Sequence, residues 1–327
     1  MNILLTLDYE LYFGESGTAE KCILQPTEAL RAISKKYNAP MTYFVDAGYL
    51  WRLEQDASKF PELLEEQNKI HIQLKSLVEE GNEIALHIHP HWEDSFYTPS
   101  GWKMDVSRYK LVDFSEQDID DIFHRYKTCL ESVVGKNITV YRAGGWCLQP
   151  FRKIQSAFLK HGITIDSSVY HGGYNDDNTY YYDFRNSPQK DRYTFSDVLT
   201  EEDENGKFIE YPIGSEIIHP LFFWCLFIWG RLLPKRHKGY GDGFPVSVKG
   251  FRKKVLSKKS LHCISLDGYF AKRIGAAAKR FSKLGNKHLV VIGHPKACTV
   301  YSLEQLEKFV AKNHTTYNFA TYTQLGD

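Results

Sequence analysis

Acidic and histidine side chains occur at the ends of short apolar segments in this chain. Asp8 and Glu10 come directly after residues 3–7, and His87, His89 and His91 lie at and just beyond the end of residues 83–87. Two imidazoles and one carboxylate bind a zinc-like ion well and leave positions for water and substrate. An ion held in this way lowers the pKa of its bound water toward ~7. These residue types therefore indicate metal-assisted hydrolysis at neutral pH.

Two further polar side chains have the same placement. Arg142 ends the segment 139–142, and His294 follows residues 289–292. In parallel α/β barrels the C-terminal ends of the strands carry the active site. We therefore expect Arg142 and His294 to share a site with the acidic and histidine residues. For the histidine run alone, surface or core imidazoles are the alternative. His89 alternates with the other two histidines, and we expect it to support them or to pack behind them.

The segments that position these residues are of two kinds. Apolar runs without polar alternation, typical of strands covered on both faces, occupy residues 3–7, 41–45, 83–87, 139–142, 164–166, 208–212, 261–266 and 289–292. Amphipathic stretches that predict helices occupy residues 26–36, 60–80, 115–134, 151–161, 269–284 and 303–312. This order predicts an α/β fold with a parallel sheet or barrel, as a single domain over residues 1–327. We expect insertions around 170–206 and 219–259, with loops at 170–206 and 235–259.

Four short motifs in this order resemble the polysaccharide deacetylase family, also called the NodB-homology family or carbohydrate esterase family four. They are Thr6-Leu7-Asp8-Tyr9-Glu10, His87 with His91 four residues later, Tyr141-Arg142-Ala143-Gly144-Gly145-Trp146, and Val290-Val291-Ile292-Gly293-His294-Pro295. Two of them depart from the common form: one residue separates the two acids, and the turn after Arg142 lacks the usual proline-aromatic pair. The resemblance implies a deformed (β/α)7 barrel, the NodB-like fold, and an enzyme that removes N-acetyl groups from amino sugars.

The resemblance also implies roles for the motif residues. Asp8 would be the general base, and Glu10 would hold a divalent metal together with His87 and His91. Zn2+ is the expected ion, and Co2+, Ni2+, Mn2+ or Fe2+ suit the same ligands.

Hydrolysis of an amide also needs an acid for the leaving amine and an ionised base. His294 is the candidate acid. Arg142 is expected to orient Asp8 through a charge-assisted hydrogen bond and to keep it ionised.

Other candidates adjoin these motifs. Trp92, Trp146 and Tyr170 could stack on a sugar ring, with core packing as the alternative for each. Asp166 ends a predicted strand and resembles a supporting acidic position of the family, although a turn or helix cap explains it equally well. Asp267 is placed similarly, and we expect an ordinary structural role for it.

The balance of charges gives no support to nucleic-acid binding. The 327 residues include 41 basic and 40 acidic side chains, a net charge of +1. The six cysteines form no CxxC pair, and the first residues lack the pattern of a secretory signal. Both features are typical of a cytoplasmic protein.

One segment is unusually apolar. Residues 220–229 read Pro-Leu-Phe-Phe-Trp-Cys-Leu-Phe-Ile-Trp, and the basic run Lys235-Arg236-His237-Lys238 follows. The apolar run is too short to cross a bilayer, which takes ~20 residues. Either it is buried in the fold, or residues 220–238 are a peripheral contact with the inner face of the membrane.

The sequence thus predicts a metal-dependent hydrolase that removes an N-acetyl or other N-acyl group from an amino sugar. We expect a sugar nucleotide, a lipid-linked sugar or an oligosaccharide as substrate, in surface-polysaccharide or lipopolysaccharide biosynthesis. Two alternatives stay open. A glycoside hydrolase on a related barrel would use two carboxylates and no metal. A carbohydrate-binding protein with the same fold would need no base, metal or acid.

Overall fold

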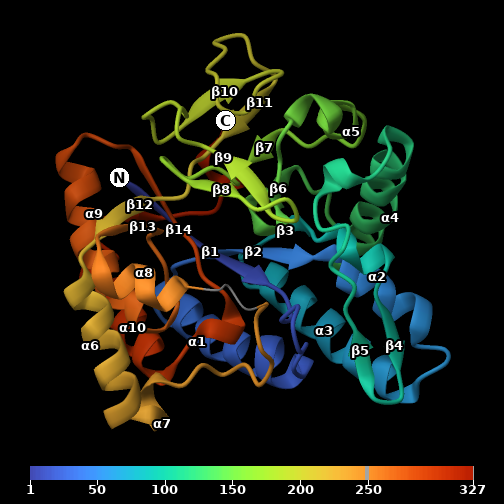
Figure 1. The fold of residues 1–327 in the computed structure, drawn as a ribbon, viewed down its shortest axis with the longest axis horizontal. Coiled ribbons are helices and arrows are strands. Elements are labelled where there is room, and N and C mark those ends of the chain that lie inside the picture. The colour runs from blue at the N-terminus through green and yellow to red at the C-terminus, as the bar shows by residue number, and fades with distance from the viewer. Residues whose placement is uncertain (247–249, 327) are drawn as a thin grey trace. The chain divides into compact units, whose positions relative to one another are not determined.

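The computed structural model describes residues 1–246 and 250–326. They form two compact units: Met1–Met41 with Ile213–Leu325 is unit 1, and Thr42–Pro212 with Gly326 is unit 2. Each unit has its own strands and helices (Figure 1), and each carries some of the predicted site residues. The prediction of a single domain over the whole chain stays a prediction.

Unit 2 is built on mainly parallel strands. Its neighbouring strands are β11 (Phe208–Glu210), β7 (Ile165–Asp166), β6 (Val140–Ala143), β3 (Glu83–Ile88) and β2 (Met41–Asp46), all in parallel pairs. The short β10 (Tyr193–Phe195) pairs antiparallel with β11. The register sets His87 opposite Asp46 on one side and Arg142 on the other. The carboxyl ends of these strands therefore bring predicted site residues together within unit 2.

Helices connect and cover these strands. They are α2 (Ala47–Asp56), α3 (Pro61–Glu79), α4 (Glu116–Val134) and α5 (Gln155–Lys160). The predicted start of α4 is confirmed, because the Ser115 hydroxyl accepts a hydrogen bond from the Asp118 amide at 3.1 Å. Gly135 ends the helix with a φ of 68°, a left-handed conformation that glycine adopts without strain.

The insertion around 170–206 is more ordered than the loop expected there. It contains the hairpin of β8 (Tyr174–Asp176) and β9 (Tyr181–Asp183), followed by β10. The other hairpin of unit 2 pairs β4 (Phe96–Thr98) with β5 (Gly101–Lys103). Strands this short carry too few residues to show a period of two in the sequence.

Unit 1 is built around its first strand. β1 (Asn2–Tyr9) pairs in parallel with β14 (His288–Val291) and β15 (Asn318–Phe319). The longer helices of the unit include α1 (Gln25–Tyr37), α9 (Ile274–Lys283) and α10 (Val300–Asn313). Buried apolar side chains fill β1 from Ile3 to Leu7, as its sequence predicted.

The strand predicted at 261–266 is only partly correct. Residues Ser260–Cys263 form β13, which pairs antiparallel with β12 (Ser215–Ile218) in a separate small sheet. The chain then turns to lie along the strand end of β14, where the Leu266 amide donates to the Ile292 carbonyl at 2.8 Å. An apolar run does not indicate which neighbour a strand pairs with, so the sequence could not separate these two stretches.

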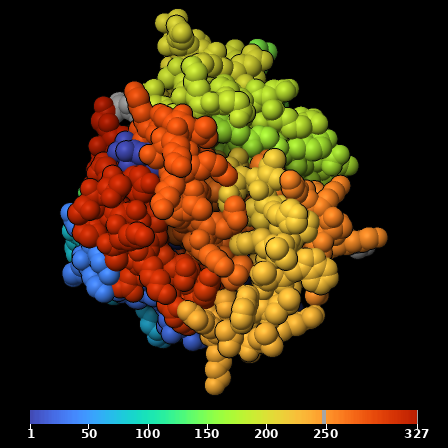
Figure 2. All heavy atoms as spheres, turned by 90° about the vertical axis from the view of Figure 1, so that its left-hand side faces the viewer, coloured from blue at the N-terminus to red at the C-terminus, as the bar shows by residue number. Residues whose placement is uncertain are grey.

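The loop predicted at 235–259 is partly correct. After α6 (Pro220–Leu232), the short helices α7 (Pro234–His237) and α8 (Phe251–Ser257) lie at the two ends of that range. Residues 238–246 between them belong to no helix or strand, and residues 247–249 lie outside the described residues. α6 and α7 lie at the surface of unit 1 (Figure 2). Among the described residues, no helix is both long enough and apolar enough to cross a membrane.

Candidate active site

The two acids of the first motif lie on one side of the chain in unit 1. Asp8 is the second-to-last residue of β1, and Glu10 follows the strand. Successive side chains of a strand point to opposite faces, so the single residue between the acids puts both on the same face. Tyr9 points the other way and is buried. Although the spacing of this motif is unusual, both carboxylates therefore point to the same side of the chain.

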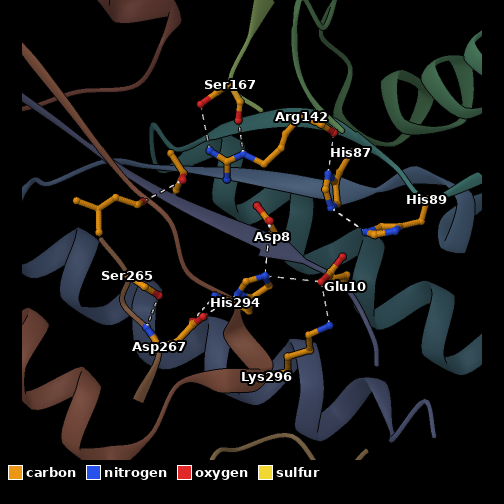
Figure 3. Close-up of polar contacts among 12 residues, drawn as sticks. Asp8, Glu10, His87, His89, Arg142, Ser167, Ser265, Asp267, His294 and Lys296 are labelled. Carbon is orange, nitrogen blue, oxygen red and sulfur yellow. Dashed lines mark hydrogen bonds and ion pairs between the residues drawn. The ribbon is translucent and has the colours of Figure 1, made fainter. Parts of the chain in front are cut away.

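His294 faces these carboxylates within unit 1 (Figure 3). Its Nε2 lies 3.6 Å from Asp8 Oδ2 and 3.8 Å from Glu10 Oε1. Its other ring nitrogen, Nδ1, lies 2.8 Å from Asp267 Oδ2, and its backbone amide donates to Asp267 Oδ1 at 2.8 Å. A carboxylate only accepts hydrogen bonds, so Nδ1 carries a proton and the ring orientation is fixed. Asp267 thus holds the imidazole with Nε2 toward the acids.

The environment of His294 favours its protonated form. Burial by itself lowers the pKa of this imidazole, but the negative charge of Asp267, with those of Asp8 and Glu10, outweighs burial and raises the pKa to about 9. In the metal-free chain the ring therefore carries a proton at neutral pH. A protonated imidazole beside carboxylates can act as a general acid.

A buried lysine completes the group in unit 1. Lys296 Nζ lies 2.9 Å from Glu10 Oε1 and donates to the Leu11 carbonyl at 2.5 Å. Lys296 and Glu10 are both almost fully buried, and a buried charge requires a partner of opposite charge. This contact fixes the direction of the Glu10 carboxylate.

In unit 2, β3 and the residues after it position the histidines. His87 Nδ1 lies 2.8 Å from the Arg142 carbonyl oxygen. Because a carbonyl only accepts, Nδ1 must carry the proton, and in a neutral ring Nε2 then carries the lone pair. Metal-binding histidines are oriented by this kind of backbone contact.

His89 lies nearer to this lone pair than was expected from its position in the run. Its Nε2 lies 3.0 Å from His87 Nε2, with the two rings nearly perpendicular. His91 is also buried, and its ring stacks on those of Trp92 and Tyr109. Within unit 2, the structure thus pairs His87 with His89.

Arg142 is held in the interior of unit 2. Its Nε donates to the Ser167 carbonyl at 2.7 Å, and a second nitrogen donates to the Ser167 hydroxyl at 3.2 Å. The guanidinium also lies 4.0 Å from the centre of the Phe44 ring. These contacts fix a fully buried positive charge at the end of β6.

Asp166 is one half of a buried carboxyl pair. It accepts from the Ser168 hydroxyl at 2.7 Å, and its partner is Glu210, whose Oε1 accepts from the Val169 amide at 3.0 Å. Burial, together with the charge of Asp166, raises the pKa of Glu210 well above its usual value, and burial also raises the pKa of Asp166. The pair therefore holds a proton that two separate exposed carboxyls would lose.

The three predicted aromatic contacts have different environments. Trp92 is fully buried and donates from its ring nitrogen to Asp46 Oδ2 at 2.6 Å. It packs in the interior of unit 2, which corrects the expectation of a sugar contact. The Tyr170 hydroxyl lies 2.7 Å from that of Tyr182 in a mostly buried cluster. Trp146 packs edge-on to Tyr170 but is partly exposed, and only this ring has an accessible face.

Three polar residues of the site were not predicted. Asp267 ends its apolar segment as the other site residues do, so its placement was a usable signal. Glu210 is a lone acid inside a predicted apolar strand, which is also unusual enough to notice. Lys296 is two residues beyond His294, and nothing in the sequence distinguishes it from the many surface lysines.

Comparisons with known proteins bear on the fold. No family model and no curated protein matches this chain. A protein assigned as a polysaccharide deacetylase from Mycobacterium smegmatis matches with a TM-score of 0.52 and 17% identity, over 99% of this chain and 88% of that one. An allantoinase matches with a TM-score of 0.52 and 13% identity, over the same shares of the two chains. The predicted α/β class and the resemblance to polysaccharide deacetylases are confirmed at the level of the fold.

Proposed function

We propose that this chain is a metal-dependent hydrolase that removes an acetyl group from the amide nitrogen of an amino sugar. The observation that carries the proposal is the His294 imidazole, which Asp267 orients toward Asp8 and Glu10. Hydrolysis of an amide requires a base for water and an acid for the leaving amine. The fold of polysaccharide deacetylases is consistent with a sugar substrate.

The chemistry of the buried donors fits a divalent ion. The tautomer of His87 gives its Nε2 the lone pair, and the Nε2 of His89 lies 3.0 Å from that nitrogen. We assign the ion to Glu10, His87 and His89, each of which offers one ligand atom. His91 is the alternative to His89, because the family spacing places the second ligand there. Zn2+ suits two imidazoles and a carboxylate, as do Co2+, Ni2+, Mn2+ and Fe2+. Such an ion acts as a Lewis acid and makes water more acidic.

The residues of the chain then divide the proton transfers. Asp8 takes a proton from water as the new C–O bond forms at the acyl carbon. His294 gives its Nε2 proton to the nitrogen as the C–N bond breaks, which leaves acetate and a free amine. Arg142, whose position Ser167 fixes, is assigned to orient Asp8.

We further propose a cytoplasmic protein that acts in the assembly of a surface polysaccharide or lipopolysaccharide. Six free cysteines suit a reducing compartment. Sugar nucleotides, lipid-linked sugars and oligosaccharides are the substrate forms to compare. Trp146, the most accessible of the three predicted rings, is assigned to stack on the sugar.

A product assay tests this proposal. The wild type, loaded with Zn2+, is incubated with N-acetylated sugar nucleotides and oligosaccharides, and acetate and new reducing ends are both measured. We expect acetate without reducing ends, and a loss of about 10²-fold or more in Asp8→Asn and in His294→Gln. The surface variants Asp121→Asn and His124→Gln are matched controls and should keep wild-type activity. Reducing ends without acetate would instead identify a glycoside hydrolase.

A further inference from the structure

α6 is apolar on both of its sides. Toward unit 1, Phe223 packs with Ile218 and Val255 in a buried cluster, and Phe222 and Phe227 pack against that cluster. A surface helix normally turns charged or polar residues to the solvent. In α6 the only charged residue is Arg231, near its end.

The solvent side of α6 carries large apolar side chains. We call Leu221, Trp224, Ile228, Trp229 and Leu232 the outer face of α6; these side chains are between 43% and 65% exposed. Their spacing of three and four residues gathers them along one side of the helix. The surface of unit 1 in Figure 2 shows this segment uncovered by the rest of the unit. A contiguous apolar surface of this kind marks a place where another partner binds.

The charges around the outer face are mostly positive. Residues 217–266 contain ten lysines and arginines and one acid, Asp242, in a chain whose total charge is +1. The exposed members adjoin α6 from two helices: Lys235 lies in α7, and Arg252, Lys253 and Lys254 lie in α8. Arg252 packs over the ring of Phe227, a residue of α6 itself. The positive charges therefore adjoin the helix that carries the outer face.

We propose that the outer face of α6 binds the surface of a membrane that contains anionic lipids. The helix has 13 residues, or ~20 Å, and so is too short to span a hydrocarbon layer of ~30 Å. A helix of this kind lies in the plane of the interface, with its apolar side among the acyl chains and tryptophans at the headgroups. The basic residues of α7 and α8 then contact the anionic headgroups.

The same charges argue against a second copy of this chain as the partner. A two-fold symmetric contact through the outer face would place one basic surface against its identical copy. Like charges held together in this way repel each other. An anionic bilayer satisfies both the apolar face and the charge. This proposal depends on the surface of unit 1 alone and stands apart from the proposed enzymatic activity.

Sedimentation with vesicles tests the proposal. The purified full chain is mixed with neutral vesicles of phosphatidylcholine alone, or with anionic vesicles of phosphatidylcholine and ~30% phosphatidylglycerol. We expect binding to the anionic vesicles, weakened by high salt, and at least about tenfold weaker binding to the neutral ones.

Two pairs of variants separate the apolar and the charged contributions. Trp224→Ala with Ile228→Ala, and Lys235→Gln with Lys238→Gln, should each weaken binding by about tenfold or more. Their matched controls are Ile72→Ala, an exposed isoleucine of unit 2, and Lys75→Gln with Lys136→Gln, exposed lysines of unit 2. The controls should bind as the wild type does.

A second measurement starts from the wild type, so its main result does not depend on how well a variant folds. Vesicles made with brominated acyl chains should quench the tryptophan fluorescence of the wild type, and Trp224→Phe should reduce the quenching. Wild-type protein that sediments with neither vesicle would overturn the proposal. So would outer-face variants that bind like the wild type, or a wild-type dimer that these variants dissociate without any lipid binding.

Discussion

At the scale of single residues, the pair of Asp267 and His294 defines the chemistry of unit 1. Asp267 bonds both the ring and the backbone amide of His294, so it sets the position and the tautomer of the imidazole together. The same carboxylate helps to raise the pKa of His294 to about 9, although burial by itself lowers it. Asp267 thus sets the orientation of the proposed acid and, together with Asp8 and Glu10, favours its protonation.

Asp267→Asn should therefore lower the pKa of His294 toward the value of ~6.5 for a free imidazole. In the metal-free wild type the folded pKa lies above the unfolded one, so the stability from this group is present below ~6.5 and is lost as the pH rises through about 9. NMR titration of the imidazole, with Asp121→Asn as a control, measures the shift. A pKa that stays near 9 in Asp267→Asn would show that other charges hold the proton.

The histidines of unit 2 make a second prediction at this scale. Because His89 Nε2 lies 3.0 Å from His87 Nε2, His87→Ala and His89→Ala should each lose most of the bound Zn2+, by about tenfold or more in affinity. His91→Ala should keep the ion, since its ring stacks between Trp92 and Tyr109. Metal analysis of the three variants after dialysis shows whether His89 or His91 holds the ion together with His87. Loss of Zn2+ in His91→Ala with retention in His89→Ala would restore the ligand set expected from the family spacing.

At the scale of elements, the turn after β6 shapes the wall beside Arg142. Trp146 has a φ of 62°, a left-handed conformation that is strained for a tryptophan. A Cβ on the neighbouring Gly145 would come too close to the rings of Tyr180 and Tyr109, so the turn is tightly packed. This packing holds the Trp146 ring in its partly exposed position.

Trp146→Ala should then weaken sugar binding more than it affects the chemical step. We expect a rise in KM of about tenfold, from the loss of one aromatic platform, and a kcat within a few-fold of the wild type. Steady-state kinetics on an N-acetylated oligosaccharide measures both, with Trp102→Ala as the control outside this turn. A fall in kcat with an unchanged KM would remove Trp146 from the proposed substrate surface.

The junction of β7 and β11 gives a further prediction. Glu210 holds its proton more tightly in the folded chain than in the unfolded one, so its contribution to stability falls as the pH rises above ~4.3. Glu210→Gln keeps a polar partner for Asp166 and cannot ionise. The difference in unfolding free energy between Glu210→Gln and the wild type should therefore grow in favour of the variant as the pH rises above ~4.3, by up to about 1.4 kcal/mol per pH unit. Denaturation at several pH values tests it, with the exposed Glu201→Gln as control, and a constant difference would contradict it.

The ends of the strands could be predicted, because an apolar run that ends at a polar residue is easily recognised in a sequence. This pattern predicted that Asp8, His87, Arg142 and His294 lie at the ends of strands, where the structure places them. It could not rank neighbours within the histidine run, since ring orientation depends on a carbonyl of another strand. α8 was missed because only one of its residues, Val255, is buried, which leaves almost no periodic signal.

At the scale of the whole molecule, each unit carries part of the proposed chemistry. Unit 1 provides the oriented acid, His294, and the carboxylates of Asp8 and Glu10. Unit 2 provides the imidazoles of His87 and His89 and the buried charge of Arg142. The proposal requires both sets of residues for one reaction. It therefore predicts that the reaction needs the metal, and this consequence can be tested directly.

Acetate release before and after removal of the metal is the most direct test of this claim. The wild type is stripped with a chelator, dialysed and assayed on N-acetylated oligosaccharides, then reloaded with Zn2+ and assayed again. We predict a loss of at least about 10²-fold on stripping, full recovery with about one Zn2+ per chain, and no recovery in His87→Ala. Acetate release that is the same in the stripped and the reloaded protein would contradict the account.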